Sequence, residues 1–183
     1  MFSRLAPAGR RTALLASFAS GALLLASTLL PQNVKPAMAA PIMRMPFLCG
    51  QTWNASTRSN HSPQFAVDFN RANDLGDAVI ASAGGTVTTV ANLGSASYGR
   101  YIIISHGGGW TTLYAHLSDV RVSQGQSVSM GQRIGSVGQS GNVSGPHLHY
   151  EQRLNGADQR VVLGSTPVAY FDETQSFTSH NNC

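Results

Sequence analysis

The sequence predicts an all-β fold, a compact single domain of antiparallel β-sheet. After residue 39, no long stretch has apolar residues at helical spacing. Short runs rich in Val, Ile, Thr and Tyr instead alternate with clusters of Gly, Asn and Ser, which is the pattern of all-β domains. No domain boundary or low-complexity tract interrupts this pattern, so we expect one domain over residues 40–183.

The first 39 residues are expected to be a secretory signal peptide. A basic start that includes Arg10-Arg11 precedes an uncharged, Ala/Leu-rich run over 12–30, and Ala37-Met38-Ala39 forms a small-x-small cleavage site. An uncleaved membrane anchor is the alternative, because the apolar run is close to spanning length. The cleavage site favours removal, so we expect a secreted protein without a membrane segment. Arg10-Arg11 leaves twin-arginine export open beside the general route.

The charge of the chain lies in its first segment. Residues 40–183 contain eight Arg, no Lys and eight acidic residues, so this part is formally neutral although the whole chain carries +4. A nucleic-acid-binding protein needs a basic footprint, and no basic cluster is present. The expected domain has a length suited to one hydrophobic core, and we expect a monomer.

Cys49 and Cys183 are the only cysteines in the chain. An exported protein meets an oxidising environment, so we expect them to form one disulfide that ties the two ends of the domain together. The alternative is a pair of zinc thiolates. It is disfavoured because lone cysteines at opposite ends lack the paired spacing of structural zinc sites.

Seven strands are predicted, each a β-favouring run between turn signals. The hairpin over 101–117 is the clearest, because Gly107-Gly108-Gly109 adopts positive φ at little cost. The segment after Pro167 is expected to be irregular up to Cys183. The expected strands are 64–69, 77–82, 85–91, 101–106, 111–117, 132–137 and 147–154.

Two histidines on the last of these strands are candidates for chemistry. His147 and His149 are separated by one residue, and side chains alternate along a strand, so both face one side and Leu148 the other. One imidazole can bind a metal while its neighbour faces bound water or substrate. Glu151 lies on the same face and could orient an imidazole by a hydrogen bond to the ring nitrogen that does not bind the metal. Two solvent-exposed histidines would be the ordinary alternative, which the Gly/Ser-rich loop 138–145 before them makes less attractive.

Two further segments carry candidate residues. His116 ends an apolar stretch, where a histidine serving only the core is the alternative to a catalytic one. His61 and Asp68 flank Pro63, whose bend could bring them together. Asp68 lies between Val67 and Phe69, where an uncompensated carboxylate would be costly, so it needs either a metal or an arginine.

Together, His61, Asp68 and one histidine of the pair form a set of two imidazoles and one carboxylate. This set suits Zn²⁺ with a fourth position for water, whereas calcium and magnesium prefer oxygen ligands. Bound zinc would lower the pKa of a bound water and so activate it. The helical motif HExxH and the serine elbow GxSxG are both absent.

The stretch from Tyr98 to Glu151, with its segments YAHL and GPHLHYE, resembles the core of the LytM/lysostaphin-type zinc metallopeptidases. The upstream NHSPQFAVDFNR is similar to the secreted β-lytic, LasA-like members, and the resemblance covers 47–154. It implies a groove over the sheet, hydrolysis of peptide bonds in peptidoglycan cross-links or stems, often next to glycine, and one zinc ion.

The resemblance also implies the role of each site residue. His61, Asp68 and His149 would bind the zinc, and His116 and His147 would be catalytic. His106 and His180 would have no role, and His106 is read as a turn residue. The gap of seven residues between His61 and Asp68 departs from the gap of four in many relatives.

Two other functions remain open at this point. A relative that has lost catalysis would be a wall-binding scaffold or an activator of another lytic enzyme. An extracellular peptidase acting on Gly-rich proteins such as elastin would have the same site and another substrate.

Overall fold

The computed structural model describes residues 39–183, and every regular element in this part of the chain is a β-strand. The expected signal peptide lies, except for Ala39, outside the described residues. Within 39–183 we find no helix that is long and apolar enough to cross a membrane.

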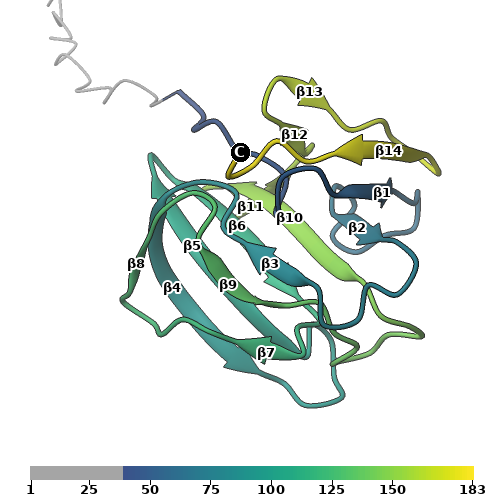
Figure 1. The fold of residues 1–183 in the computed structure, drawn as a ribbon, viewed down its shortest axis with the longest axis horizontal. Helices are drawn as coiled ribbons and strands as arrows, with labels where there is room; N and C mark the ends of the chain where they lie inside the picture. The colour runs from purple at the N-terminus through teal and green to yellow at the C-terminus, as the bar shows by residue number, and fades with distance from the viewer. Residues whose placement is uncertain (1–38) are drawn as a thin grey trace, which may run out of the picture. The chain divides into compact units, whose positions relative to one another are not determined.

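The strands form three antiparallel sheets, and the all-β prediction is confirmed (Figure 1). In the largest sheet the spatial order is β14 (Thr174–Thr178), β1 (Thr52–Ser56), β2 (Val67–Asn70), β10 (Leu148–Leu154), β6 (Trp110–Ala115), β5 (Arg100–Gly107), β4 (Gly85–Asn92) and β8 (Ser127–Val128), and β11 (Ala157–Gln159) pairs with β10. A second sheet contains β3 (Ala78–Ile80), β9 (Arg133–Ser136) and β7 (Asp119–Val120), and a third contains β12 (Val162–Leu163) and β13 (Thr166–Pro167).

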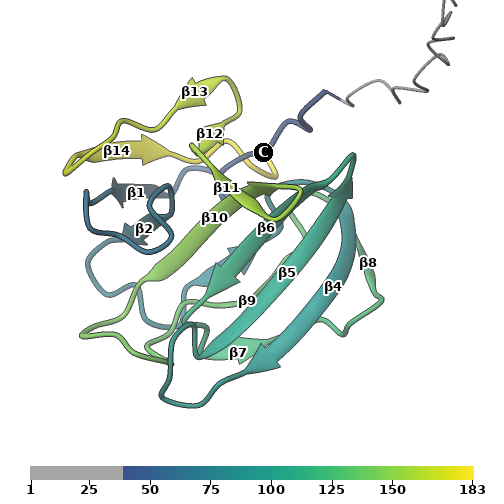
Figure 2. The same ribbon diagram turned by 180° about the vertical axis from the view of Figure 1, so that it is seen from behind.

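The second sheet lies against one face of the large one. Figure 1 shows β3, β9 and β7 in front of the long strands β4, β5 and β6, and Figure 2, from behind, shows the same long strands in front. Apolar side chains fill the space between the layers, among them the fully buried Ile102, Ile104, Leu117 and Ile134. The opposite face of the large sheet is therefore free to carry polar residues.

Each of the seven predicted strands corresponds to an observed one, and seven further strands were not expected, β1 and β14 among them. In β1, the fully buried Trp53 and Ala55 alternate with the exposed Thr52 and Asn54, which is the period of a half-buried strand. The expectation of an irregular tail is wrong for β14. This strand has one large apolar residue, Phe177, and it is ordered by its antiparallel pairing with β1 rather than by a local signal.

Strand β10 separates the core from the opposite face of the sheet. Leu148 and Tyr150 are fully buried within the aromatic and aliphatic core, where Tyr150 packs against Phe69 and Tyr114. Side chains alternate along a strand, so His149 and Glu151 point to the other face. The core residues of β10 thereby fix the direction in which these two polar side chains point.

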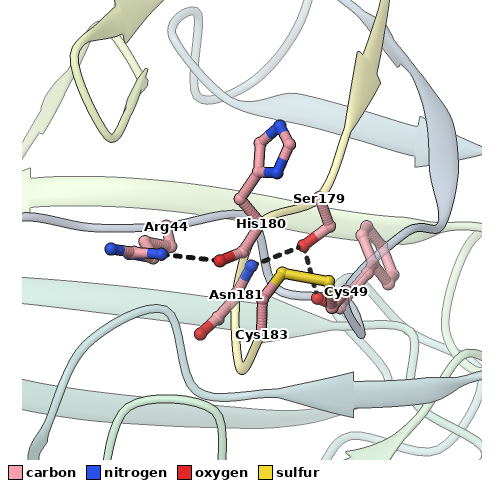
Figure 3. The surroundings of a disulfide bond; sticks show 7 residues. Arg44, Cys49, Ser179, His180, Asn181 and Cys183 are labelled. Atoms are coloured by element: carbon pink, nitrogen blue, oxygen red, sulfur yellow. Dashed lines mark hydrogen bonds between the residues drawn. A yellow bond between two sulfur atoms is a disulfide. The ribbon is translucent and has the colours of Figure 1, made fainter.

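The predicted disulfide is present, and it joins Cys49 to Cys183 (Figure 3). Hydrogen bonds hold the tail beside it: Ser179 Oγ donates to the Phe47 carbonyl at 2.6 Å, and Arg44 Nη1 donates to the His180 carbonyl at 2.6 Å. The buried Asn181 donates through Nδ2 to the Met45 carbonyl at 2.8 Å. The C-terminus is thus tied to the segment before β1 by polar contacts as well as by the covalent bond.

We predict that replacing both cysteines, in the variant Cys49→Ser/Cys183→Ser, lowers stability without abolishing the fold. The bond closes a loop with a sequence separation of 134 residues, and chain entropy assigns such a loop about 5 kcal/mol. The hydrogen bonds of the tail remain in the variant. Thermal unfolding should therefore show a lower Tm with an unchanged circular dichroism spectrum at 25 °C. An unchanged Tm would contradict a stabilising role for the bond.

Candidate metal centre

Three side chains from distant parts of the sequence converge on one point. His61, Asp68 and His149 each offer one ligand atom, and these atoms lie within 4.8 Å of one another. Asp68 Oδ2 is 3.3 Å from His61 Nε2, and Asp68 Oδ1 is 3.2 Å from His149 Nδ1. All three side chains are largely shielded from solvent, with exposed fractions of 11%, 7% and 4%. The structure thus brings together the three residues predicted as metal ligands.

Sheet register accounts for two of the three positions. Asp68 of β2 and His149 of β10 are direct partners across neighbouring antiparallel strands, where Cβ atoms lie about 4.5–5.5 Å apart. His61 lies in the irregular segment between β1 and β2, and this segment folds back so that its ring reaches Asp68. The predicted bend around Pro63 is therefore present.

The geometry and the donor set fit a zinc ion. Zinc bonds of roughly 2.0–2.2 Å in a tetrahedron place neighbouring ligand atoms roughly 3.3–3.6 Å apart. The separations of 3.3 Å from His61 Nε2 to Asp68 Oδ2 and 3.2 Å from His149 Nδ1 to Asp68 Oδ1 are close to this value, and they involve the two different oxygens of the carboxylate. Two imidazoles and a carboxylate are also the ligand types of catalytic zinc sites that keep one position open.

The hydrogen bonds of His149 give a second reason to expect a cation. Its Nε2 lies 2.9 Å from Glu151 Oε1, and because a carboxylate only accepts, this nitrogen carries the proton. In the neutral ring, the Nδ1 lone pair then faces the Asp68 oxygen, an arrangement that needs a proton or a metal between the two atoms. Burial lowers the pKa of His149, but hydrogen bonds to Asp68 and Glu151 outweigh this effect and raise it overall. Either a proton or a metal cation would satisfy both atoms.

Asp68 is ionised despite its burial. Burial raises the pKa of this carboxyl, but hydrogen bonds and charge interactions with His149 and His61 hold it well below its usual range. Arg58 also donates to Asp68 Oδ2. The sequence left open whether a metal or an arginine compensates Asp68, and the structure provides an arginine as well as the two imidazoles.

Glu151 lies directly behind His149, where the sequence placed a second layer of support. It is 1% exposed and accepts three hydrogen bonds: from His149 Nε2, from Tyr98 Oη at 2.7 Å and from Arg153 Nε at 2.5 Å. Burial raises its pKa, but the bonds from His149 and Arg153 lower it overall. The charged carboxylate fixes the tautomer of His149, so that Nδ1 faces Asp68.

His116 and His147 stand together beside the cluster. Their ring centroids are 4.8 Å apart, and His147 Nε2 lies 3.7 Å from Asp68 Oδ1. His116 Nδ1 donates to the Ser140 carbonyl at 2.8 Å, and His147 Nδ1 donates to the Gly145 carbonyl at 3.0 Å. In the neutral rings, the lone pair is therefore on Nε2 in both residues. Burial, opposed by the bond to Ser140, lowers the pKa of His116 to about 4.

The backbone of His116 differs from the predicted strand geometry. The predicted strand 111–117 ends at Ala115 as β6, and His116 follows with φ of 63°. A non-glycine residue in this left-handed region costs about 1–3 kcal/mol and is retained where the surroundings require it. Its N–H donates to the Tyr98 carbonyl at 3.0 Å, so the turn that directs the ring is fixed from two sides.

The three candidate ligands and the two further histidines, His116 and His147, line one polar pocket of about 570 Å³. Part of its wall comes from two loops whose backbones touch. A Cβ on Gly99 would lie 2.3 Å from the Ser140 carbonyl carbon, and one on Gly141 would lie 2.3 Å from the Ser97 carbonyl oxygen. Glycine is therefore required at both positions. Among the glycines of loop 138–145, Gly141 brings the backbone against the neighbouring loop and Gly138 brings it against residues 116–118, whereas nothing lies within 4 Å of a Cβ at Gly145.

Sequence reasoning missed three residues at this site: Arg58, Tyr98 and Ser140. Tyr98 is 53 residues from its partner Glu151, and Ser140 is 24 residues from His116, so no local pattern links them. Arg58 precedes His61 by three residues, a proximity that could have been noted.

The two remaining histidines lie outside the pocket lining, as expected. His106 is part of β5 rather than a turn, and its ring bonds the Gly84 carbonyl and Thr112 Oγ1, both at 2.8 Å. His180 is exposed in the tail.

An all-β domain with a buried His/Asp/His cluster beside two further histidines defines a metallopeptidase-type site. Residues 62–161 match the model of peptidase family M23, and this chain belongs to that family. The matched segment contains Asp68, His116, His147 and His149 but starts one residue after His61.

Known proteins of this family resemble the chain in sequence and fold. It is 41% identical over 108 residues to the peptidoglycan DD-endopeptidase ShyA of Vibrio cholerae, covering 59% of this chain and 24% of that protein. It is 43% identical over 108 residues to the DD-carboxypeptidase/endopeptidase Mpg of Neisseria meningitidis, with the same coverage of 59% and 24%. The antimicrobial peptidase lysostaphin from Staphylococcus simulans superposes with a TM-score of 0.52 at 26% identity, covering 71% of this chain and 51% of that one.

The predicted resemblance to lysostaphin-type metallopeptidases and the predicted fold are thereby confirmed. The chain spans about a quarter of the length of these curated relatives.

We predict that His149→Ala and Asp68→Ala each abolish stoichiometric zinc binding. Each variant removes one of the three converging ligand atoms, and a zinc site left with two protein ligands is weak. Metal analysis after dialysis against trace zinc should give about one zinc per wild-type chain and far less for either variant. His180→Ala, which removes an exposed histidine of the tail, is the control and should keep its zinc. A zinc-loaded Asp68→Ala protein would disprove the assignment.

Proposed function

We propose that this chain is an exported zinc endopeptidase that hydrolyses peptide bonds in bacterial peptidoglycan. The observation that carries the proposal is the convergence of His61, Asp68 and His149 next to the paired rings of His116 and His147. The name of ShyA, a peptidoglycan DD-endopeptidase, supports peptidoglycan peptides as the substrate class. We further propose that the protein acts as a monomer outside the cell, in contact with the wall.

In this proposal, His61, Asp68 and His149 hold the ion, and Glu151 orients His149. Zinc bound there would supply Lewis-acid polarisation of the scissile carbonyl and would acidify water. The buried Glu151 and Asp68 place two negative charges close to the site, which favours retention of a divalent cation.

The remaining chemistry falls to His116 and His147. Because the pKa of His116 is lowered to about 4, its ring is neutral at pH 7. Its Nδ1–H is bound to Ser140, so Nε2 can accept a proton from attacking water. His147 has the same arrangement with Gly145 and stands 4.8 Å away, ring to ring. We assign proton acceptance from the attacking water to Nε2 of one of these two rings; once protonated there, that ring can donate a hydrogen bond to the developing oxyanion.

The geometry favours catalysis over a scaffold that has lost its reaction. A scaffold needs neither three converging ligand atoms nor two histidines whose tautomers are fixed by backbone carbonyls. The left-handed backbone of His116 costs about 1–3 kcal/mol, and strain of this kind clusters at functional sites. We therefore place hydrolysis ahead of a wall-binding or activating role, and we place peptidoglycan ahead of elastin-type proteins because of the names of the relatives.

The experiment that tests this proposal is mass spectrometry of the fragments that the zinc-loaded protein releases from purified cell walls. New amino termini should appear, and a zinc chelator should suppress them. The fragments identify the bond, either next to glycine, as the resemblance implies, or between two D-centres, as in DD-endopeptidases. Elastin incubated in parallel is the comparison substrate. Release from elastin but not from walls would contradict the proposal.

We predict that His116→Ala retains zinc but hydrolyses walls roughly 10²–10⁴-fold more slowly, the usual contribution of a general acid–base residue. His116 is not one of the three converging ligands, so metal analysis should match wild type. The matched control is His106→Ala, because His106 is also partly buried and hydrogen-bonded but lies outside the pocket lining. Normal turnover by His116→Ala would remove this residue from the mechanism.

A further inference from the structure

Arg58 is a charged side chain of the pocket that the proposed metal chemistry does not use. It lies on the segment between β1 and β2, its side chain is 54% exposed, and one of its terminal nitrogens, Nη2, donates to Asp68 Oδ2. A guanidinium has five N–H donors in a planar fork. Among the described residues the contact with Asp68 is its one hydrogen bond. The other donors remain available on a side chain that lines the pocket.

The charges of the pocket define what these donors can bind. Arg58 and Asp68 are its only lining residues with a permanent charge, apart from the histidines, and the other lining side chains are neutral, among them Asn60, Ser97 and Asn142. With a divalent ion on Asp68, the ion and Arg58 carry three positive charges against the one negative charge of the lining, and the buried Glu151 is paired with Arg153. The pocket therefore attracts an anionic group, and a planar fork of N–H donors matches a carboxylate.

The contact with Asp68 also limits where that carboxylate can be. Asp68 is a proposed metal ligand, and the bond to be cut would lie at the metal. The Arg58 guanidinium is therefore about one substrate residue away from that bond. In a peptide, the scissile carbonyl carbon and the α-carboxylate carbon of the residue that supplies the leaving amine are roughly 3–4 Å apart. A free carboxylate on that residue could thus reach Arg58 while the carbonyl lies at the metal.

We infer that Arg58 binds a free carboxylate on the residue that follows the cleaved bond, and so selects substrates in which that residue carries one. The inference deepens the proposed function and rests on it for the identity of the peptide. It separates two classes of wall peptide. A bond inside an uninterrupted run of glycines has no such carboxylate, whereas a bond to a residue with a free α-carboxylate does.

The test compares one peptide in two forms. A cross-linked peptide released from purified walls is used with its carboxylates free and after their conversion to amides. Binding is measured by calorimetry on zinc-loaded His116→Ala protein, so that affinity is read without turnover, and kcat/KM is measured on protein with His116 intact. The free acid should be preferred roughly 10- to 100-fold, the range for hydrogen bonds to charged groups.

Variants of two arginines isolate the contribution of Arg58. Arg58→Gln should bring the acid-to-amide ratio close to one, and Arg58→Lys should retain part of the preference because it keeps the charge without the fork. Arg121→Gln is the matched control. Arg121 also pairs with an aspartate, Asp119 at 2.9 Å, its side chain is 52% exposed, and it lies outside the pocket lining. It should behave as the unmodified protein does, and all variants should hold the same amount of zinc.

Two results would overturn the inference. In the first, Arg58→Gln retains the preference for the free acid, which would mean that a group other than Arg58 binds the carboxylate. In the second, the variant loses zinc and weakens both peptide forms equally, which would make Arg58 a positioning partner of Asp68 alone. Wall hydrolysis by the unmodified protein reports separately on the proposed function. Hydrolysis without an acid preference removes only the carboxylate site, and an acid preference in binding without hydrolysis removes only the enzymatic activity.

Discussion

The buried carboxylate of Asp68 is the constraint on which the rest of the site depends. It lies between Val67 and Phe69, both fully buried, and a lone carboxylate there would be strongly disfavoured. Its position opposite His149 across β2 and β10 supplies one partner directly, and the segment before β2 supplies His61 and Arg58. Four cationic or ionisable groups, including His147, thus surround one negative charge. This concentration of donors and charge marks a functional site rather than a structural ion pair.

Glu151 extends the same logic one step outward. A second buried carboxylate directly behind His149 makes the ring a stronger ligand and fixes its tautomer. Glu151 in turn accepts hydrogen bonds from Tyr98 and Arg153. The His149 ring therefore lies between two carboxylates, Asp68 and Glu151, and each carboxylate has further hydrogen-bond donors. Arg153 lies on β10, and Tyr98 lies on the loop between β4 and β5 and lines the pocket. The bond from Tyr98 to Glu151 therefore couples the position of His149 to the wall of the pocket.

The sequence predicts those parts of the site that follow from local rules. Alternation along β10 places His149 and Glu151 toward one face, with His147 just before the strand, and a buried acidic residue in β2 signals an interaction partner. The direct opposition of Asp68 and His149 depends on which strands become neighbours, and these two residues are 81 positions apart in the chain. For the same reason Tyr98 and Ser140 were not found, since their contacts depend on the packing of two glycine-containing loops.

Strand β14 shows the same limit and also explains how the site is supported. Its sequence, with one large apolar residue, has no strand signal of its own, but pairing with β1 orders it. The segment that leads into it holds the loop that carries Arg58 and His61. Thr57 Oγ1 donates to the Ala169 carbonyl at 3.1 Å, and Tyr170 Oη donates to the Phe65 carbonyl at 2.8 Å.

The ligand loop is therefore held at both of its ends by the tail, while Asp68 and His149 are held by the sheet. Ser59 N adds a third contact, donating to Asp172 Oδ1 at 2.9 Å. The disulfide to Cys183 and the buried Asn181 keep the end of this tail docked. A chain end that would otherwise be poorly ordered is therefore fixed to the domain. Through it, the loop ligand His61 is kept next to the strand ligands Asp68 and His149.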